Sequence, residues 1–171
     1  MFLSALGLLV FPAIMVFAAS SDLLTMRISN LSVLALIVAF LALSLLTGMP
    51  FEQIAAHLAC AAVVLLIGFA FFAFGWIGGG DAKLAAGIAL WIGVGQIFPF
   101  LLYSALWGGM LTATLLAIRR WPLPASMRRL TWVDRLHDNA KGVPYGIALA
   151  AAALFVYPHT DIYRVLLATV G

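Results

Sequence analysis

The segment Ile54–Trp76, with the sequence IAAHLACAAVVLLIGFAFFAFGW, contains no Asp, Glu, Lys or Arg along its whole length. Its apolar residues run continuously and do not alternate with polar ones, which favours a helix over a strand. A continuous apolar run of about 20 residues is long enough to cross a hydrocarbon core of roughly 30 Å. The segment therefore predicts a membrane-spanning helix.

The rest of the chain has the same character, because 65% of its residues are hydrophobic and 9% are charged. A soluble domain typically has about 25% charged residues. Backbone groups inside a bilayer must be satisfied within the protein, so the spans must be helices or a closed barrel. We expect an all-α fold, with one domain over residues 1–171 built from about six membrane-spanning helices. The expected spans are Phe2–Ala19, Leu31–Thr47, Ile54–Trp76, Ala82–Val94, Phe100–Ile118 and Val143–Tyr157.

The basic residues predict an orientation. If the N-terminus is outside, eight of the nine basic residues fall in the connections after the first, third and fifth spans, and Arg164 alone lies on the other side. Such an asymmetry marks the cytoplasmic side of a membrane protein. The basic residues then explain the net charge of +3, because they orient the protein in the membrane and contact anionic lipid. We therefore expect the lipid bilayer as a partner, and no nucleic acid. The eight residues are Arg27, Lys83, Arg119, Arg120, Arg128, Arg129, Arg135 and Lys141.

Acidic residues are scarce, six in 171, and two of them follow predicted spans that open on the same side. Asp22 follows the first span, and Asp81 follows the third span directly after Gly78, Gly79 and Gly80. Two neighbouring carboxylates can hydrolyse a peptide bond: one takes a proton from water, and its protonated partner binds the carbonyl oxygen. Consecutive glycines let a substrate backbone approach closely and permit backbone angles that other residues avoid.

Each of these residues also has a plain structural explanation. Asp81 could cap the helix that follows it, and Asp22 could pair with Arg27. Lys83 could act on Asp81, bind substrate, or extend to the membrane interface. We expect His57, in the third span, to be packed and hydrogen bonded rather than a ligand. No His, Cys and carboxylate residues have metal-ligand spacing, so neither a metal nor another cofactor is expected.

The longest polar stretch is Trp121–Gly142. Within it, apolar residues recur every third position with charged residues between them. This pattern predicts a short amphipathic helix at the membrane interface, or alternatively a solvated loop. The recurring apolar residues are Met127, Leu130, Val133 and Leu136.

Taken together, these motifs resemble those of bacterial type IV prepilin peptidases, in the short branch that serves tight-adherence (Flp) pili. That family has an aspartate followed by an R-I-P-N-like string, and a G-x-G-D motif followed by a lysine. Ser29 stands where the family often has proline, which affects the stiffness of the loop. A Val-Pro-Tyr-Gly string at 143–146 is also typical of the family. The matching residues are Asp22, Arg27, Ile28 and Asn30 for the first motif, and Gly78, Gly79, Gly80, Asp81 and Lys83 for the second.

The resemblance implies a multi-pass aspartyl endopeptidase of the bacterial cytoplasmic (inner) membrane. It would cleave the leader from prepilin or pseudopilin substrates at the cytoplasmic face. Longer members carry a four-cysteine domain and also methylate the product; with one cysteine here, methylation is not expected. Two other hypotheses stay open: a small transporter or proton-relay subunit that uses Asp22 and Asp81, and a non-catalytic assembly subunit. The implied catalytic residues are Asp22 and Asp81, and the implied substrate-binding or loop-forming residues are Gly78, Gly79, Gly80, Lys83, Arg27 and Asn30.

Overall fold

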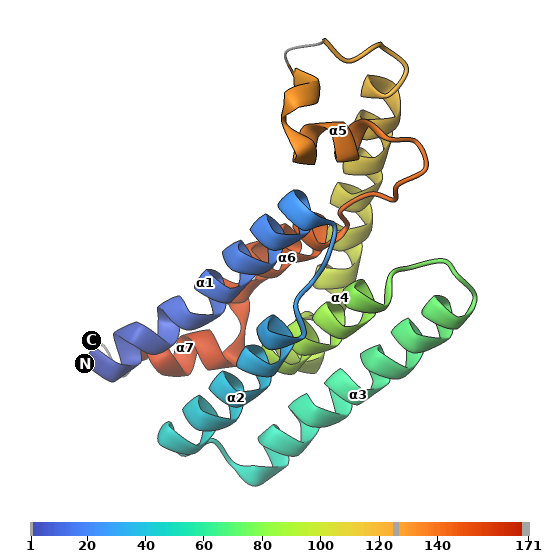
Figure 1. The fold of residues 1–171 in the computed structure, drawn as a ribbon. Coiled ribbons are helices and arrows are strands. Elements are labelled where there is room, and N and C mark those ends of the chain that lie inside the picture. The colour runs from blue at the N-terminus through green and yellow to red at the C-terminus, as the bar shows by residue number, and fades with distance from the viewer. Residues whose placement is uncertain (1, 125–126, 169–171) are drawn as a thin grey trace.

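The computed structural model describes residues 2–124 and 127–168. Over these ranges the chain is helical and contains no strand, which confirms the expected all-α fold (Figure 1). The elements are α1 (Phe2–Thr25), α2 (Asn30–Leu46), α3 (Phe51–Ala73), α4 (Gly79–Ile118), α5 (Thr131–His137), α6 (Gly146–Val156) and α7 (Asp161–Ala168), with 3-10 turns at Met127–Arg129 and Tyr157–His159.

Within the described residues, three helices are long and apolar enough to cross a membrane, and two shorter helices are also apolar. The long ones are Gly7–Thr25, Phe51–Ala73 and Gly79–Ile118, and the shorter ones are Asn30–Leu46 and Gly146–His159. Large apolar side chains cover the outside of these helices; on α3, Leu66 is 71% exposed and Phe69 is 62% exposed. Apolar surface of this kind is unfavourable in water, so it fits contact with lipid.

The longest helix, α4, contains a break at Gly93, whose φ of 67° and ψ of −178° are not helical. Asp81 from the start of α4 and Thr112 from near its end line the same pocket. In one straight helix these residues would lie about 45 Å apart. The two halves of α4 therefore fold back on each other, as its green and yellow parts show in Figure 1. The break separates the segments that the sequence assigned to two spans.

His57 of α3 lies against this break. Its Nδ1 donates a hydrogen bond of 2.7 Å to the carbonyl of Leu90. A Cβ atom placed on Gly93 would lie 2.7 Å from the ring carbon Cε1 of His57. The ring also packs against Phe40, with centroids 5.2 Å apart. The expectation that His57 is packed and hydrogen bonded is confirmed, and it supports the point where α4 turns.

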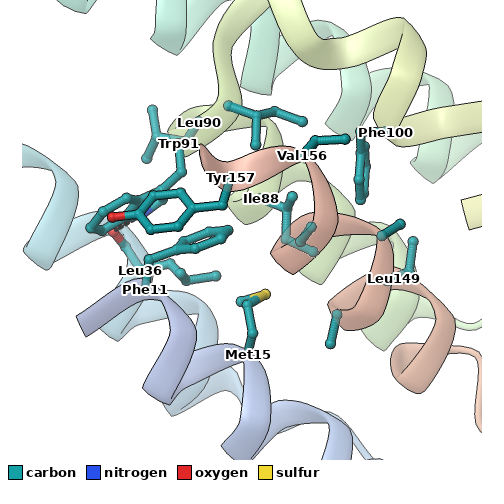
Figure 2. Packing of buried hydrophobic residues seen from close by; sticks show 14 of the residues in the cluster. Phe11, Met15, Leu36, Ile88, Leu90, Trp91, Phe100, Leu149, Val156 and Tyr157 are labelled. Carbon is teal, nitrogen blue, oxygen red and sulfur yellow. Dashed lines mark hydrogen bonds between the residues drawn. The ribbon is translucent and has the colours of Figure 1, made fainter. Parts of the chain in front are cut away.

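An aromatic cluster fixes the helices relative to one another (Figure 2). Phe11 of α1 contacts Trp91 of α4 with ring centroids 5.0 Å apart, and Tyr157 after α6 with centroids 4.6 Å apart. The buried Trp91 satisfies its polar atom, because Nε1 donates a hydrogen bond of 2.9 Å to the carbonyl of Leu36 in α2. Since α6 also packs against both α1 and α4, these three helices form the frame for the site.

One prediction about a helix end is wrong. α1 does not end at Ala19 but continues to Thr25, so Asp22 lies inside the helix rather than after it. Residues 20–22 are polar, so hydropathy falls there. A helix can nevertheless continue through polar residues when other groups of the protein form hydrogen bonds with their side chains. The residue after the helix, Met26, has a left-handed φ of 55°, and its N–H donates a hydrogen bond of 2.8 Å to the carbonyl of Asp22.

The polar stretch after α4 folds as two short elements rather than one continuous amphipathic helix. The 3-10 turn Met127–Arg129 is followed by α5 (Thr131–His137). Arg135 of α5 donates a hydrogen bond of 2.7 Å to the carbonyl of Leu24. Carbonyls in the last turn of a helix have no partner within the helix, so this contact caps α1 and docks the segment on the bundle.

Candidate active site

Asp22 is buried, with 5% of the residue exposed. Its Oδ2 accepts a hydrogen bond of 2.8 Å from the backbone N–H of Gly146, the first residue of α6. N–H groups in the first turn have no partner within their own helix, and the helix dipole favours a negative charge there. The start of α6 therefore provides a favourable environment for a carboxylate that α1 carries.

Glycine at position 146 is what lets the two helices approach this closely. A Cβ atom on Gly146 would lie 2.8 Å from Oδ2 of Asp22 and 3.0 Å from Cδ1 of Ile28. Contacts this short are not tolerated, so any side chain at position 146 would displace the carboxylate or the chain around it. Close approach of helix backbones is a characteristic use of glycine.

Asp81 lies in the first turn of α4, three residues after the N-cap Gly78. Its carboxylate lies against the N-cap residue, because a Cβ atom placed on Gly78 would lie 2.8 Å from Oδ2 of Asp81. Asp81 is therefore not the N-cap residue itself, although it does serve this helix end. Both acids thus lie at helix N-termini, Asp81 at that of its own helix and Asp22 at that of α6.

The structure brings the two carboxylates into common pockets. Asp22 and Asp81 both line a pocket of about 690 Å³, together with Met26, Thr112 and Tyr145. They also share a smaller pocket of about 350 Å³. Two carboxylates in one open pocket can bind a water molecule and a polarised carbonyl group between them.

The three glycines before Asp81 act through close packing rather than through unusual backbone angles. A Cβ atom on Gly78 would lie 2.8 Å from Oδ2 of Asp81, and one on Gly80 would lie 3.2 Å from Cβ of Ile28. Gly79 faces the ring of Phe72, with a Cβ distance of 3.3 Å. None of the three has a positive φ. Gly78, Gly79 and Gly80 also line the smaller acid pocket, so a side chain there would fill space beside the acids.

Lys83 lies apart from the two acid pockets. Its Nζ donates a hydrogen bond of 3.2 Å to Oδ1 of Asn30, so it ties the start of α4 to the start of α2. The two sequence motifs therefore meet through these side chains, neither of which lines a pocket with the acids.

Arg27 lines the smaller acid pocket together with Asp22 and Asp81. It is not ion-paired with Asp22; among the side chains that the structure describes, the ion pair found is that of Arg164 with Asp161. The pairing considered from the sequence is therefore not formed, and the Arg27 side chain is exposed at the rim of the site.

Tyr145 was not chosen as a site residue from the sequence, although the Val-Pro-Tyr-Gly string was a signal for it. Its hydroxyl donates a hydrogen bond of 2.9 Å to the carbonyl of Ser104, and the residue lines the larger acid pocket together with Asp81. The ring fits directly against Gly108, where any Cβ atom would overlap it. Tyr145 thus anchors the start of α6 to the second half of α4.

Arg119 is a further residue of the site. In the sequence it counts only as one of the basic residues that predict the orientation in the membrane. Its guanidinium donates to the carbonyls of Leu136, Lys141 and Gly142 at 2.7, 3.2 and 2.9 Å. Lys141 and Gly142 line the larger acid pocket, so Arg119 orders one wall of the site. The sequence carried no signal for this role, because its partners are backbone groups.

Within the described residues, no group of three or more His, Cys, Asp or Glu side chains is arranged to hold a metal ion. The polar groups that line the two acid pockets include the two carboxylates and the side chains of Arg27, Thr112, Lys141 and Tyr145.

Comparison with known proteins assigns a family to this arrangement. The type IV leader peptidase family matches residues 9–113, more than half of the chain. The matched range contains Asp22 and Asp81 and ends before Tyr145 and Gly146. No curated protein and no solved structure matches the chain significantly. By the extent of the family match, the chain belongs to the type IV leader peptidase family.

Proposed function

We propose that this protein is an aspartyl endopeptidase that removes the leader peptide of prepilin-like proteins, with Asp22 and Asp81 as its catalytic pair. The family supports a peptidase of this type. The observation that carries the assignment of residues is that both carboxylates, 59 positions apart in the sequence, line one pocket.

In the proposed reaction, one carboxylate is ionised and the other is protonated when substrate binds. The ionised group takes a proton from a water molecule as the water oxygen attacks the scissile carbonyl carbon. The protonated group hydrogen bonds the carbonyl oxygen and stabilises the charge that develops there. Collapse of the tetrahedral intermediate breaks the C–N bond, and the leaving nitrogen receives a proton from the pair. Two close carboxylates sharing one proton are suited to this exchange.

The protein environment assists by holding the pair in place. Asp22 is fixed by the N–H of Gly146 at the start of α6, and Asp81 is fixed in the first turn of α4. Because positioning within about 1 Å matters for rate, helix starts are better supports than mobile loops. Arg27, at the rim of the smaller pocket, and the glycines before Asp81 would then border the path of the substrate backbone.

We further propose that the site faces the cytoplasm, that the substrate's apolar helix stays in the bilayer, and that the leader reaches the acids from the aqueous side. The excess of basic residues on that side supports this orientation. The tight-adherence branch stays a prediction from the sequence.

Co-expression with a tagged prepilin, in a host that lacks its own leader peptidase, tests the function. We expect a shorter pilin on a gel, with a single new N-terminus by mass spectrometry, and unprocessed prepilin with the empty vector. A correctly inserted protein that leaves all tested prepilins uncut would instead favour a transporter or proton-relay role for the two acids.

A further inference from the structure

An apolar groove runs along α3 on the outside of the bundle, where the first half of α4 comes to the surface. It consists of two adjoining pockets of about 220 and 490 Å³. Lys83 and Leu65 line both pockets, and Lys83 is the charged residue among the described residues that line them. We refer to the two pockets together as the lysine groove. Apart from this lysine, its walls are apolar side chains and glycine.

The packing of the helices leaves this groove open. Both α2 and α3 pack against α4, but they make little contact with each other. The smaller pocket is lined by Ile37 of α2 and Leu58 of α3, both of which are exposed. A space that protein side chains do not fill loses dispersion contacts, and an apolar space does not hold water well. In a membrane, an apolar chain from outside the protein therefore fits this groove.

Lys83 brings a charge to this apolar surface. Over residues 82–93, all of which the structure describes, it is the one exposed residue. Its ammonium group has three N–H donors, and the described contact is a single hydrogen bond of 3.2 Å to Oδ1 of Asn30. No described carboxylate forms an ion pair with it. A cation that faces lipid is unfavourable without a partner of opposite charge, so the groove is suited to a ligand that carries a negative charge.

Lys141, the other lysine of the chain, has different surroundings. It is also exposed, but it lines the larger acid pocket together with Asp22 and Asp81. An anion at that position would meet two carboxylates. Lys83 thus combines a positive charge with an apolar groove, and Lys141 does not.

We propose that the lysine groove binds an anionic phospholipid, with the phosphate on Nζ of Lys83 and one acyl chain in the smaller pocket. Along α4 this pocket reaches from Lys83 to Leu90, about 10 Å or two helical turns. The second chain lies in the larger pocket, over Phe69 and Phe72 of α3. A phospholipid matches the groove because one molecule supplies both a negative charge and apolar chains. Basic pockets between membrane helices are typical sites for anionic head groups.

The test uses purified full-length protein in detergent, with added phosphatidylglycerol, which is anionic, and phosphatidylcholine of equal chain length, which is zwitterionic. Native mass spectrometry measures the lipid bound to each protein over a range of lipid concentrations. We expect wild-type protein to bind phosphatidylglycerol more tightly than phosphatidylcholine. Lys83→Gln should weaken phosphatidylglycerol binding about fivefold, the effect of one lysine near an anionic head group, and leave phosphatidylcholine binding unchanged. Lys141→Gln removes the same charge elsewhere and should keep the wild-type preference.

A second pair of variants tests the groove separately from the charge. Ala62 is an exposed residue of α3 that lines the smaller pocket, so Ala62→Phe should fill this pocket and reduce binding of both lipids. Ala59→Phe, at an exposed position of the same helix outside both pockets, should bind lipid as the wild-type protein does.

The proposal makes the lipid preference depend on Lys83. Equal binding of the two lipids by wild-type protein would overturn it, as would equal losses in Lys83→Gln and Lys141→Gln. A dimer that binds no lipid would also overturn it, and would show that a second copy of the chain covers the groove. The wild-type and lysine measurements leave the walls of the groove unchanged, so misfolding of Ala62→Phe does not remove the test. No peptide is cleaved in this assay, so its result is independent of the proposed function.

Discussion

The backbone N–H of Gly146 donates a hydrogen bond of 2.8 Å to the carboxylate of Asp22, across 124 positions of the sequence. One carboxylate of the proposed pair is therefore oriented by the start of α6, a helix outside the part of the chain that matches the family. Because α6 also packs on α4, which carries Asp81, this helix sets the relation between the two acids.

Substitution of Gly146 by alanine tests this role of α6. The new Cβ atom would lie 2.8 Å from Oδ2 of Asp22 and should push the carboxylate out of position. We expect kcat to fall about a hundredfold, the effect of a shift of about 1 Å at a reacting group. Gly95→Ala is the control, because nothing lies within 4 Å of its Cβ position. Equal activity of the two variants at equal protein level would show that α6 does not position Asp22.

Substitution of Gly108 by alanine tests the anchor at Tyr145. A Cβ atom at this position overlaps the tyrosine ring, so the ring must move and its hydrogen bond to Ser104 should break. We expect cleavage to fall about tenfold or more, by displacement of groups beside Asp81. The neighbouring Gly109, whose Cβ position is open, provides the matched control. A steady-state assay in which Gly108→Ala matches Gly109→Ala would contradict the anchoring role.

Gly93→Ala should destabilise the protein rather than alter its chemistry directly. The φ of 67° with ψ of −178° lies in a region that is essentially restricted to glycine and costs other residues about 1–3 kcal/mol. The added Cβ atom would also meet the His57 ring at 2.7 Å. Thermal unfolding in detergent should show a lower midpoint than for Gly95→Ala. An unchanged midpoint would mean that α4 does not need this break.

Lys83→Gln should leave most of the activity intact. The lysine contacts Asn30 at an exposed position and lines neither pocket that contains both acids. We expect kcat/KM within a few-fold of the wild-type value, since exposed polar contacts contribute about 1 kcal/mol or less. A loss as large as that of an aspartate variant would place Lys83 in the catalytic machinery.

The sequence predicted much of the fold, because apolar runs report directly on which segments can enter a membrane. It placed α2 and α3 closely and separated the two halves of α4. It misjudged the end of α1, since hydropathy measures lipid contact and not helix formation. The carboxylate of Asp22 can lie inside the helix because the N–H of Gly146 in α6 donates a hydrogen bond to it. A partner 124 positions away does not appear in a hydropathy profile, which averages over neighbouring residues.

The candidate site was predicted in part. The two acids stood out because charged residues are scarce in this chain, and the glycines stood out through their motif. The contacts of Arg119 could not be predicted, since it binds three backbone carbonyls and backbone groups carry no sequence signal. The role of Gly108 could not be predicted either. Its missing side chain leaves space for the Tyr145 ring, and the two residues meet only because α4 folds back on itself.

The most direct test of the catalytic pair is the cleavage of one purified prepilin by Asp22→Asn, Asp81→Asn and the double variant, each normalised to folded protein in the membrane. Asparagine keeps the shape of aspartate but can neither accept the proton of water nor share one with its partner. We expect each single variant to abolish cleavage and the double variant to be no worse than either, because the two groups act as one unit. Near-normal cleavage by either correctly inserted single variant would show that its aspartate only supports a helix end, and would contradict the catalytic pair.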